Sequence, residues 1–185
     1  MSFNFSLFMT ALDFAAEKHK FQKRKGINPA PYINHPIKVA QTLVEVGGIE
    51  EVDVLTAALL HDTIEDTDAT VEELQTVFGK KVTAIVLEVT DDKRMAWSER
   101  KAYQIVKAPN LSKEAKLVKL ADKTCNITDI VNQPPDWPVE RKISYLVWAK
   151  KVVDALGGNV NPSLEERFAL KYQEGMDVLV TETHS

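Results

Sequence analysis

The stretch that most constrains this 185-residue chain covers residues 52–67 and changes abruptly from apolar to ionisable. Residues 52–60 are apolar except for Asp53 and Thr56, and a segment that apolar on all sides is buried in a core. Four ionisable groups at the tip of a buried segment are costly unless something compensates them, and a divalent cation does so most simply. The alternative is a helix end that returns to water. The four groups are His61, Asp62, Glu65 and Asp66.

The rest of the chain predicts an all-α fold of about ten helices. No segment shows convincing alternation with a period of two, whereas apolar residues recur at helical spacing along most of the sequence. We expect one domain over residues 1–185, with the last helix, 162–180, packed on it. The other expected helices include 4–20, 36–46, 52–60, 71–78, 82–89 and 98–106, one that follows Ser112, and one that ends before Gly157.

A few residues mark where these helices begin and end. Pro36 suits a first helical turn, with Asn34 or His35 at the cap. Thr70 begins a capping box, in which Ser or Thr is followed three residues later by Glu, and Gly79 stops that helix. A largely apolar run ends in an aspartate, Asp122.

Composition narrows the class of protein. The net charge of −4 argues against a general nucleic-acid binder, and no apolar run reaches the length of a membrane span. The single cysteine, Cys125, cannot form an internal disulfide, which fits a cytoplasmic location. Residues 1–10 carry no basic residue, so a signal peptide is not expected.

Two histidines and two aspartates form the candidate metal ligands: His35, His61, Asp62 and Asp122. Each is expected at a helix end. A mixed nitrogen and oxygen set suits Mn²⁺ or Fe²⁺ in octahedral geometry, and it lacks the cysteines of structural zinc sites. The sequence around His61 is HDTIE and not HExxH, which excludes the zinc-protease motif. Spacing alone does not bring the four residues together.

A basic cluster lies before the first of these histidines. Six groups that can be positive fall within residues 18–25, in a chain that is acidic overall. They are Lys18, His19, Lys20, Lys23, Arg24 and Lys25. The cluster is either a solvated helix end, where cations also favour the helix dipole, or an anion-binding surface beside His35.

An ordered set of motifs gives the chain a family resemblance. The motifs are PYINHP (31–36), AALLHDTIEDT (57–67), FG (78–79), VTDDK (89–93) and KLADKTCN (119–126), within a region of similarity over residues 11–156. Together they resemble the HD-domain metal-dependent phosphohydrolases. The chain is similar to the hydrolase domain of RelA/SpoT enzymes, and above all to the stand-alone small alarmone hydrolases, including the metazoan SpoT homologues.

The resemblance implies an all-helical HD fold that hydrolyses (p)ppGpp at its 3′-pyrophosphate, with one Mn²⁺ ion per chain and no synthetase activity. It makes His35, His61, Asp62 and Asp122 the metal ligands and Glu65 and Asp66 the catalytic acidic pair. It assigns nucleotide binding to Arg24, Lys25, Asn126, Arg141 and Tyr145. The chain departs from the family at residues 95–97, where some relatives place a lysine near Trp97, and at residues 19–22, where the usual His-x-Gly-Gln reads HKFQ. We expect a structural role for His19.

Two other functions are compatible with the sequence. An HD phosphohydrolase could act on another phosphorylated nucleotide, for example as an NADPH 2′-phosphatase. A non-catalytic alarmone sensor belongs to a different class, and it would be expected to have lost a metal ligand or the acidic pair. For either function the partner is a small nucleotide and not a nucleic acid or a membrane, and the protein is expected to be a monomer or a small homo-oligomer.

Overall fold

The computed structural model describes residues 4–26 and 29–182; the ends of the expected 1–185 domain and residues 27–28 lie outside the described residues. The described part contains nine α-helices and one short 3-10 helix, Ala108–Asn110, so the all-α class is confirmed with one α-helix fewer than ten. Its only β feature is an isolated bridge between Lys23 and Pro31. The helices are α1 (Phe5–Lys18), α2 (Asn34–Glu45), α3 (Val52–Leu60), α4 (Thr63–Asp66), α5 (Val71–Val89), α6 (Trp97–Lys107), α7 (Lys113–Asn132), α8 (Val139–Ala155) and α9 (Pro162–Glu182).

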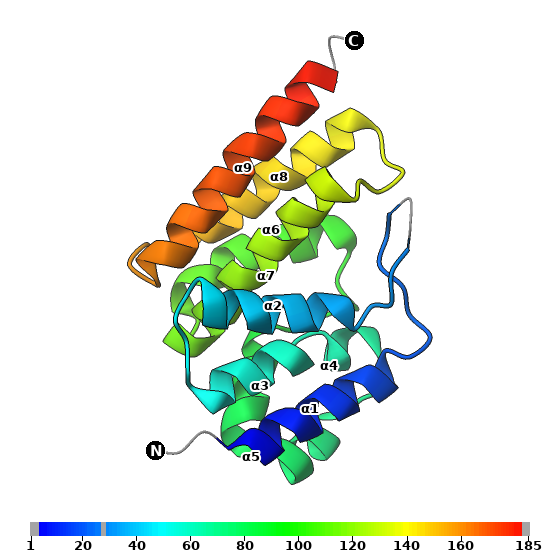
Figure 1. Ribbon diagram of the computed structural model, residues 1–185, viewed down its shortest axis with the longest axis vertical. Coiled ribbons are helices and arrows are strands. Elements are labelled where there is room, and N and C mark those ends of the chain that lie inside the picture. The colour runs from blue at the N-terminus through cyan, green and yellow to red at the C-terminus, as the bar shows by residue number, and fades with distance from the viewer. Residues whose placement is uncertain (1–3, 27–28, 183–185) are drawn as a thin grey trace.

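Helices α3 and α7 form the centre of the molecule. Residues 54–60 of α3 are all buried, as the apolar run predicts, and α3 packs against α1, α2, α5 and α7. Helix α7 also contacts α2 and α5 on one side and α8 and α9 on the other. Figure 1 shows α1 to α5 gathered at one end of the molecule and the long α8 and α9 at the other. Polar side chains on α3 and α7 are therefore held by the core itself.

Helix α9 packs along α7 and α8. A glycine allows a close approach at this contact: a Cβ atom on Gly175 would lie 2.7 Å from Leu146 Cδ2 and 2.9 Å from Val131 Cγ2. Asn161 caps the start of α9, because its side-chain oxygen accepts the backbone N–H of Leu164 at 3.1 Å. No helix in the described residues is both long enough and apolar enough to cross a lipid bilayer.

The expected start of α2 and the expected end of α7 are wrong. Helix α2 begins at Asn34, so neither Asn34 nor His35 is its cap, and Pro36 falls in the first turn, where a missing N–H costs nothing. Helix α7 continues for ten residues beyond Asp122, which therefore lies inside the helix and not at its end. Apolar residues after position 121 still recur at the helical period. Packing against α2 and α5 on one side and α8 and α9 on the other stabilises this part of α7. As a result, Asp122 and Asn126 share one face of α7.

The capping box at Thr70 is confirmed: the Thr70 hydroxyl accepts the Glu73 N–H at 3.1 Å, and Glu73 Oε2 accepts the Thr70 N–H at 2.8 Å. Gly79 does not end α5 but bends it, with φ 80° and ψ 170°. The two helices expected at 71–78 and 82–89 are thus the two arms of α5, joined by one non-helical residue. This backbone region is accessible in practice only to glycine.

Replacement of Gly79 by alanine should destabilise the fold through backbone strain alone, because a Cβ atom there meets nothing within 4 Å. The expected loss in the free energy of unfolding is about 1–3 kcal/mol. Chemical denaturation of Gly79→Ala would measure it, with Gln75→Ala, an exposed change on the same helix, as the control. A stability within about 0.5 kcal/mol of wild type, the usual range for a surface change, would contradict this account of the bend.

Candidate active site

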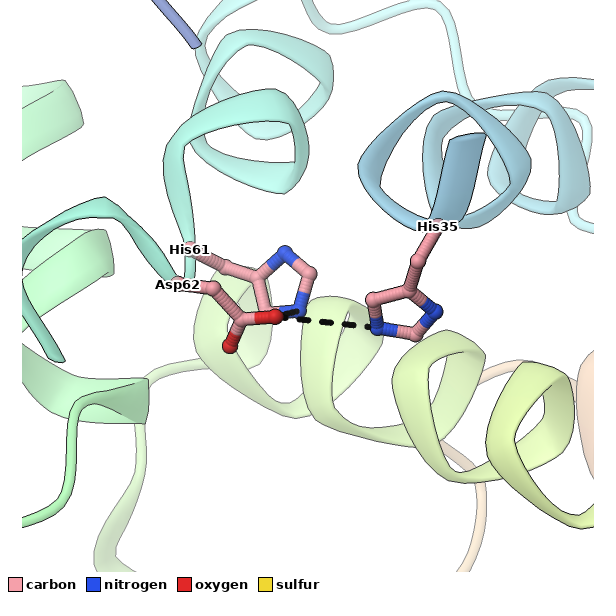
Figure 2. Close-up of side chains that lie close together, drawn as sticks. All are labelled: His35, His61 and Asp62. Atoms are coloured by element: carbon pink, nitrogen blue, oxygen red, sulfur yellow. Dashed lines mark ion pairs between the residues drawn. The ribbon is translucent and has the colours of Figure 1, made fainter. Parts of the chain in front are cut away.

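Three of the predicted ligands converge where α3 ends against α2. The ligand atoms of His35, His61 and Asp62 all lie within 4.8 Å of one another. His61 follows the last residue of α3, Asp62 comes next, and His35 lies in the first turn of α2. Figure 2 shows the three side chains turned toward one another, with the His61 ring beside the Asp62 carboxylate and His35 facing them from the neighbouring helix.

Asp122 completes the predicted set from α7. Its Oδ1 lies 3.1 Å from His35 Nε2 and 3.7 Å from His61 Nε2. Asp62 Oδ2 lies 3.1 Å from His61 Nε2 and 3.8 Å from His35 Nε2. The four residues that the sequence could not place relative to one another are therefore neighbours. Three different helices hold them, all packed in one core.

The protonation of His61 suits a metal ligand. Its Nδ1 lies 2.8 Å from the carbonyl oxygen of Ala58, and because a carbonyl only accepts, Nδ1 carries the proton. Once His61 gives up its second proton, the lone pair is on Nε2, which is buried and has no hydrogen-bond partner although carboxylate oxygens lie close by. An unpartnered nitrogen facing carboxylates is the arrangement that a shared divalent cation would satisfy.

The pKa values of the clustered residues also favour a bound cation. Burial would raise the pKa of the Asp62 and Asp122 carboxyls. The neighbouring His61 nevertheless holds the pKa of Asp62 below its usual range, and Lys123 does the same for Asp122. Burial would likewise lower the pKa of His61, yet the two carboxylates outweigh it and raise that pKa to about 10. A site that holds a proton so firmly favours any cation that can replace it. The residues therefore fit a divalent metal ion.

The predicted acidic pair lies on α4, the single turn that follows Asp62. Glu65 Oε2 accepts the backbone N–H of Asp91 at 2.9 Å, and burial is the main cause that raises the pKa of Glu65 above its ordinary value. Asp66 pairs with Lys93. Both carboxylates line the inner cavity, a space of about 170 Å³ that His35, His61, Asp62 and Asp122 also line. The pair is thus next to the metal ligands and separate from them.

Tyr32 links the metal-ligand candidates to the acidic pair, a contact that no sequence pattern predicted. Its hydroxyl donates to Asp62 Oδ2 at 2.7 Å and lies 3.3 Å from Asp66 Oδ2. Burial, then the charges of Asp62 and Asp66, raise the pKa of Tyr32, so that the hydroxyl keeps its proton and acts as a donor. The motif PYINHP drew attention to His35 alone.

A second space, the outer cleft, opens beside the inner cavity and has a volume of about 330 Å³. The two share Arg24, Tyr32, Asp66 and Asn126 in their linings, so they adjoin. Four of the five residues predicted to bind the nucleotide line the outer cleft, and they are Arg24, Lys25, Asn126 and Tyr145. Lys23, Asp129 and Trp137 also line it.

Contacts fix the residues at the boundary of the two spaces. Arg24 Nη2 donates to Asn126 Oδ1 at 2.7 Å and to Asp129 Oδ2 at 2.8 Å. Asn126 in turn donates to Asp122 Oδ1. Arg24 is therefore not a solvated helix-end cation, because hydrogen bonds tie it through Asn126 to the metal-ligand candidate Asp122.

The fifth predicted residue, Arg141, does not line the outer cleft but stacks beside it. Its guanidinium carbon lies 4.3 Å from the centre of the Trp137 ring, over which the Lys25 ammonium also lies, at 6.0 Å. The sequence analysis did not identify Trp137 or Lys101 as residues near the candidate site. The Lys101 ammonium lies 4.5 Å from the ring centre of Trp97 and 4.2 Å from that of Trp148.

These cations are not neutralised within the protein. Over residues 4–26 and 29–182, no ion pair joins Lys25, Lys101 or Arg141 to a carboxylate. Burial, together with repulsion from Lys123 and Arg141, lowers the pKa of Lys101 to about 8. Uncompensated cations that surround aromatic rings next to a metal centre suit an anionic ligand that also carries a ring.

Comparison with known proteins agrees with this geometry. A family model described as an HD domain matches residues 11–150. Guanosine-3′,5′-bis(diphosphate) 3′-pyrophosphohydrolase MESH1 of Homo sapiens is 48% identical over 174 residues, which cover 92% of this chain and 96% of that protein. MESH1 of Xenopus tropicalis is 50% identical over 159 residues, which cover 85% and 89%.

Solved structures give the same result. A structure reported as a metazoan ortholog of SpoT that hydrolyzes ppGpp superposes with a TM-score of 0.90 at 44% identity, over 94% of this chain and 98% of the other. The crystal structure of lmo0812 from Listeria monocytogenes superposes with a TM-score of 0.65 at 28% identity, over 80% and 99%. Because a family model covers most of the chain and these relatives match it in sequence and fold, the chain belongs to the HD-domain family and, within it, to the group that contains the MESH1 proteins.

Proposed function

We propose that this chain is a metal-dependent hydrolase of guanosine 3′,5′-bis(diphosphate) and its 5′-triphosphate analogue, which it cleaves at the 3′-pyrophosphate to give GDP or GTP and pyrophosphate. The observation that carries the proposal is that the two spaces adjoin. A buried His/Asp cluster that fits a divalent cation lies beside a cleft of aromatic rings and uncompensated cations, and Asp66 lines both spaces. The names of its relatives agree with this substrate.

The proposed metal ion is Mn²⁺, one per chain, held by His35, His61, Asp62 and Asp122. Two imidazoles and two carboxylates are ordinary ligands for this ion. When bound, the ion supplies Lewis acidity, which polarises a phosphoryl oxygen and lowers the pKa of a coordinated water. Lys123 Nζ, 3.1 Å from Asp122 Oδ2, holds the second carboxylate oxygen.

The nucleotide is proposed to lie in the outer cleft. Arg24, Lys25 and Arg141 would offset the charge of its phosphates, and Tyr145 and Trp137 offer apolar faces to the rest of the molecule. The scissile phosphate would then lie at the boundary with the inner cavity, beside Asn126 and Asp66. Arg24 is already fixed there by two hydrogen bonds, so little of its freedom is lost on binding.

Glu65 and Asp66 are proposed to move the protons of the reaction. Water attacks phosphorus, the bond between phosphorus and the 3′ oxygen breaks, and a proton must pass from the water to that oxygen. Glu65 is partly buried and its pKa is raised, which suits a carboxylate that accepts a proton at neutral pH. Asp66 lines both spaces, at the position where the leaving oxygen would be.

The proposal also covers the domain organisation, the oligomeric state and the location of the protein. The chain is proposed to act as one domain, as a monomer or small homo-oligomer, in the cytoplasm. Cys125, its only cysteine, is buried and free, which is compatible with a reducing compartment.

A turnover assay tests the substrate directly. The purified protein would be incubated with ppGpp, NADPH and a deoxynucleoside triphosphate in parallel, with Mn²⁺ and with EDTA. The proposal expects GDP and pyrophosphate from ppGpp in the presence of Mn²⁺ only. Faster release of phosphate from NADPH would favour the 2′-phosphatase, and ppGpp binding without any turnover would favour the sensor.

The metal assignment predicts that Asp62→Ala loses the stabilising effect of the ion. A ligand that binds only the native state adds about 2.7 kcal/mol of stability at 100 times its Kd. After EDTA treatment, added Mn²⁺ should raise the Tm of the wild type and of Asp68→Ala, an exposed carboxylate nearby, but not that of Asp62→Ala. Wild-type manganese content in purified Asp62→Ala would refute the assignment.

The proposed proton-transfer role of Glu65 and Asp66 predicts that variants of either residue lose turnover and keep manganese binding. Glu65→Gln keeps the shape of the side chain and removes the charge, so kcat should fall by roughly 10²–10⁴-fold while manganese content stays the same. Asp66→Asn should behave alike, and the double variant should be far from additive if the two act as a unit. Kinetics and metal analysis on the same samples would decide, and near-normal kcat in both single variants would exclude the catalytic role.

Variants of the cations in the outer cleft are expected to change KM and not mainly kcat. Arg24→Ala and Lys25→Ala should raise KM more than they lower kcat, because these groups hold the substrate in its ground state. Lys20→Ala is the matched control, since Lys20 belongs to the same basic cluster, pairs with Glu17 and lies outside the cleft. An unchanged KM in both Arg24→Ala and Lys25→Ala would refute their role in holding the substrate.

A further inference from the structure

Tyr32 lies between the candidate metal ligands and the acidic pair. Its hydroxyl donates to Asp62 Oδ2 at 2.7 Å, and Asp66 Oδ2 is a second, more distant acceptor at 3.3 Å. Asp62 Oδ2 is also the carboxylate oxygen that faces the histidines, 3.1 Å from His61 Nε2 and 3.8 Å from His35 Nε2. One hydroxyl therefore contacts the oxygen that would bind the ion and a carboxylate proposed to move a proton.

The Tyr32 ring is held in place by the segment that follows α1. His19 is buried and stacks on it, with ring centres 4.7 Å apart and planes 28° apart. His19 Nδ1 lies 2.7 Å from Gln22 Oε1, and the Gln22 amide donates to the backbone carbonyl of Asp66. The Tyr32 N–H also donates to the Gln22 carbonyl at 2.9 Å.

These contacts form one closed unit. Gln22 connects Tyr32 and His19 to the main chain of the α4 turn, while the Tyr32 hydroxyl connects them to the side chains of Asp62 and Asp66. His19 and Gln22 are the ends of the HKFQ segment. The structural role expected for His19 thus has a specific form, because its ring supports the one that carries the hydroxyl.

We propose that Tyr32 is a positioning residue, whose hydroxyl fixes the ligand oxygen of Asp62 and ties it to Asp66. The expected effect of Tyr32 on kcat rests on the proposed function, whereas its expected effect on metal affinity rests on the geometry of the candidate ligands. A carboxylate has two oxygens and can turn, so a hydrogen bond to one of them selects the orientation in which the site is complete. Residues that orient metal ligands in this way typically change metal affinity or activity by 10–100-fold when they are replaced.

Tyr32→Phe is the test, because it removes the hydroxyl and keeps the ring between His19 and Arg24. Mn²⁺ binding would be measured by calorimetry on the metal-free protein without substrate, and the affinity should fall by about 10–100-fold. Tyr172→Phe is the matched control, since Tyr172 lies on α9 and stacks on Phe168, away from the site. Its Mn²⁺ affinity should equal that of the wild type.

Kinetics with ppGpp test the link to Asp66. At saturating Mn²⁺, Tyr32→Phe should lower kcat by about tenfold and leave KM nearly unchanged, because the hydroxyl bonds Asp62 and Asp66 and not the cations of the outer cleft. Adding Asp66→Asn should cost less in Tyr32→Phe than in the wild type, as expected for residues that share one contact.

The outcomes separate the two proposals. Wild-type Mn²⁺ affinity in Tyr32→Phe, or an equal loss in Tyr172→Phe, would overturn the positioning role. Independent, multiplicative effects of Tyr32→Phe and Asp66→Asn on kcat would overturn the link to Asp66. A wild-type protein that binds Mn²⁺ but does not hydrolyse ppGpp would refute the proposed function instead, and the binding measurement would still decide the role of Tyr32.

Discussion

The concentration of negative charge between α2, α3 and α7 is the constraint on which the rest of the structure depends. Asp62 and Asp122 are ionised and close to a hydrophobic core, which is costly unless positive charge or hydrogen-bond donors surround them. The surroundings supply both: two imidazoles, the Lys123 ammonium, the Tyr32 hydroxyl and the Asn126 amide all reach these carboxylates. A divalent cation would complete the set, and the bundle is built so that helices from distant parts of the chain meet at that point.

The cation requirement also explains the arrangement of the neighbouring cleft. A phosphorylated substrate brings further negative charge to a place that already has two carboxylates and an acidic pair. Lys25 lines the outer cleft and Arg141 stacks on its Trp137, where both would attract the substrate without neutralising the candidate ligands. Arg24 is the exception, and its charge is shared between Asp129 and the hydrogen bond to Asn126. Separation of the two charge environments would let two adjoining spaces hold a cation and an anion.

Local sequence signals predicted most of the fold. The buried segment 54–60, the capping box at Thr70 and the start of α9 after Asn161 each depend on near neighbours, and the structure agrees with them. The errors have a common cause. Asp122 looked like a helix end because a charge followed an apolar run, whereas the packing of α7 on several helices carries the helix through it.

What could not be predicted is long-range. Tyr32 meets Asp62 thirty positions away, and Arg24 meets Asp129 at a separation of 105. No periodicity encodes such pairs. The family resemblance supplied the list of site residues, but it was silent on Tyr32 and Lys101, whose roles become visible only when the helices are assembled.

The buried character of α3 has one more consequence, which concerns motion. Residues 54–60 belong to the core and lead without a break into His61 and Asp62, so the ligands cannot swing away unless core packing opens as well. Amide hydrogens of this segment would exchange with solvent only through the global unfolding reaction, whereas the rim of the outer cleft, with exposed Lys25 and Arg141, is free to fluctuate locally. Rigidity and adaptability are thus divided between two sides of the same site: an ion would meet a nearly fixed frame, and a nucleotide would meet side chains that can adjust to it.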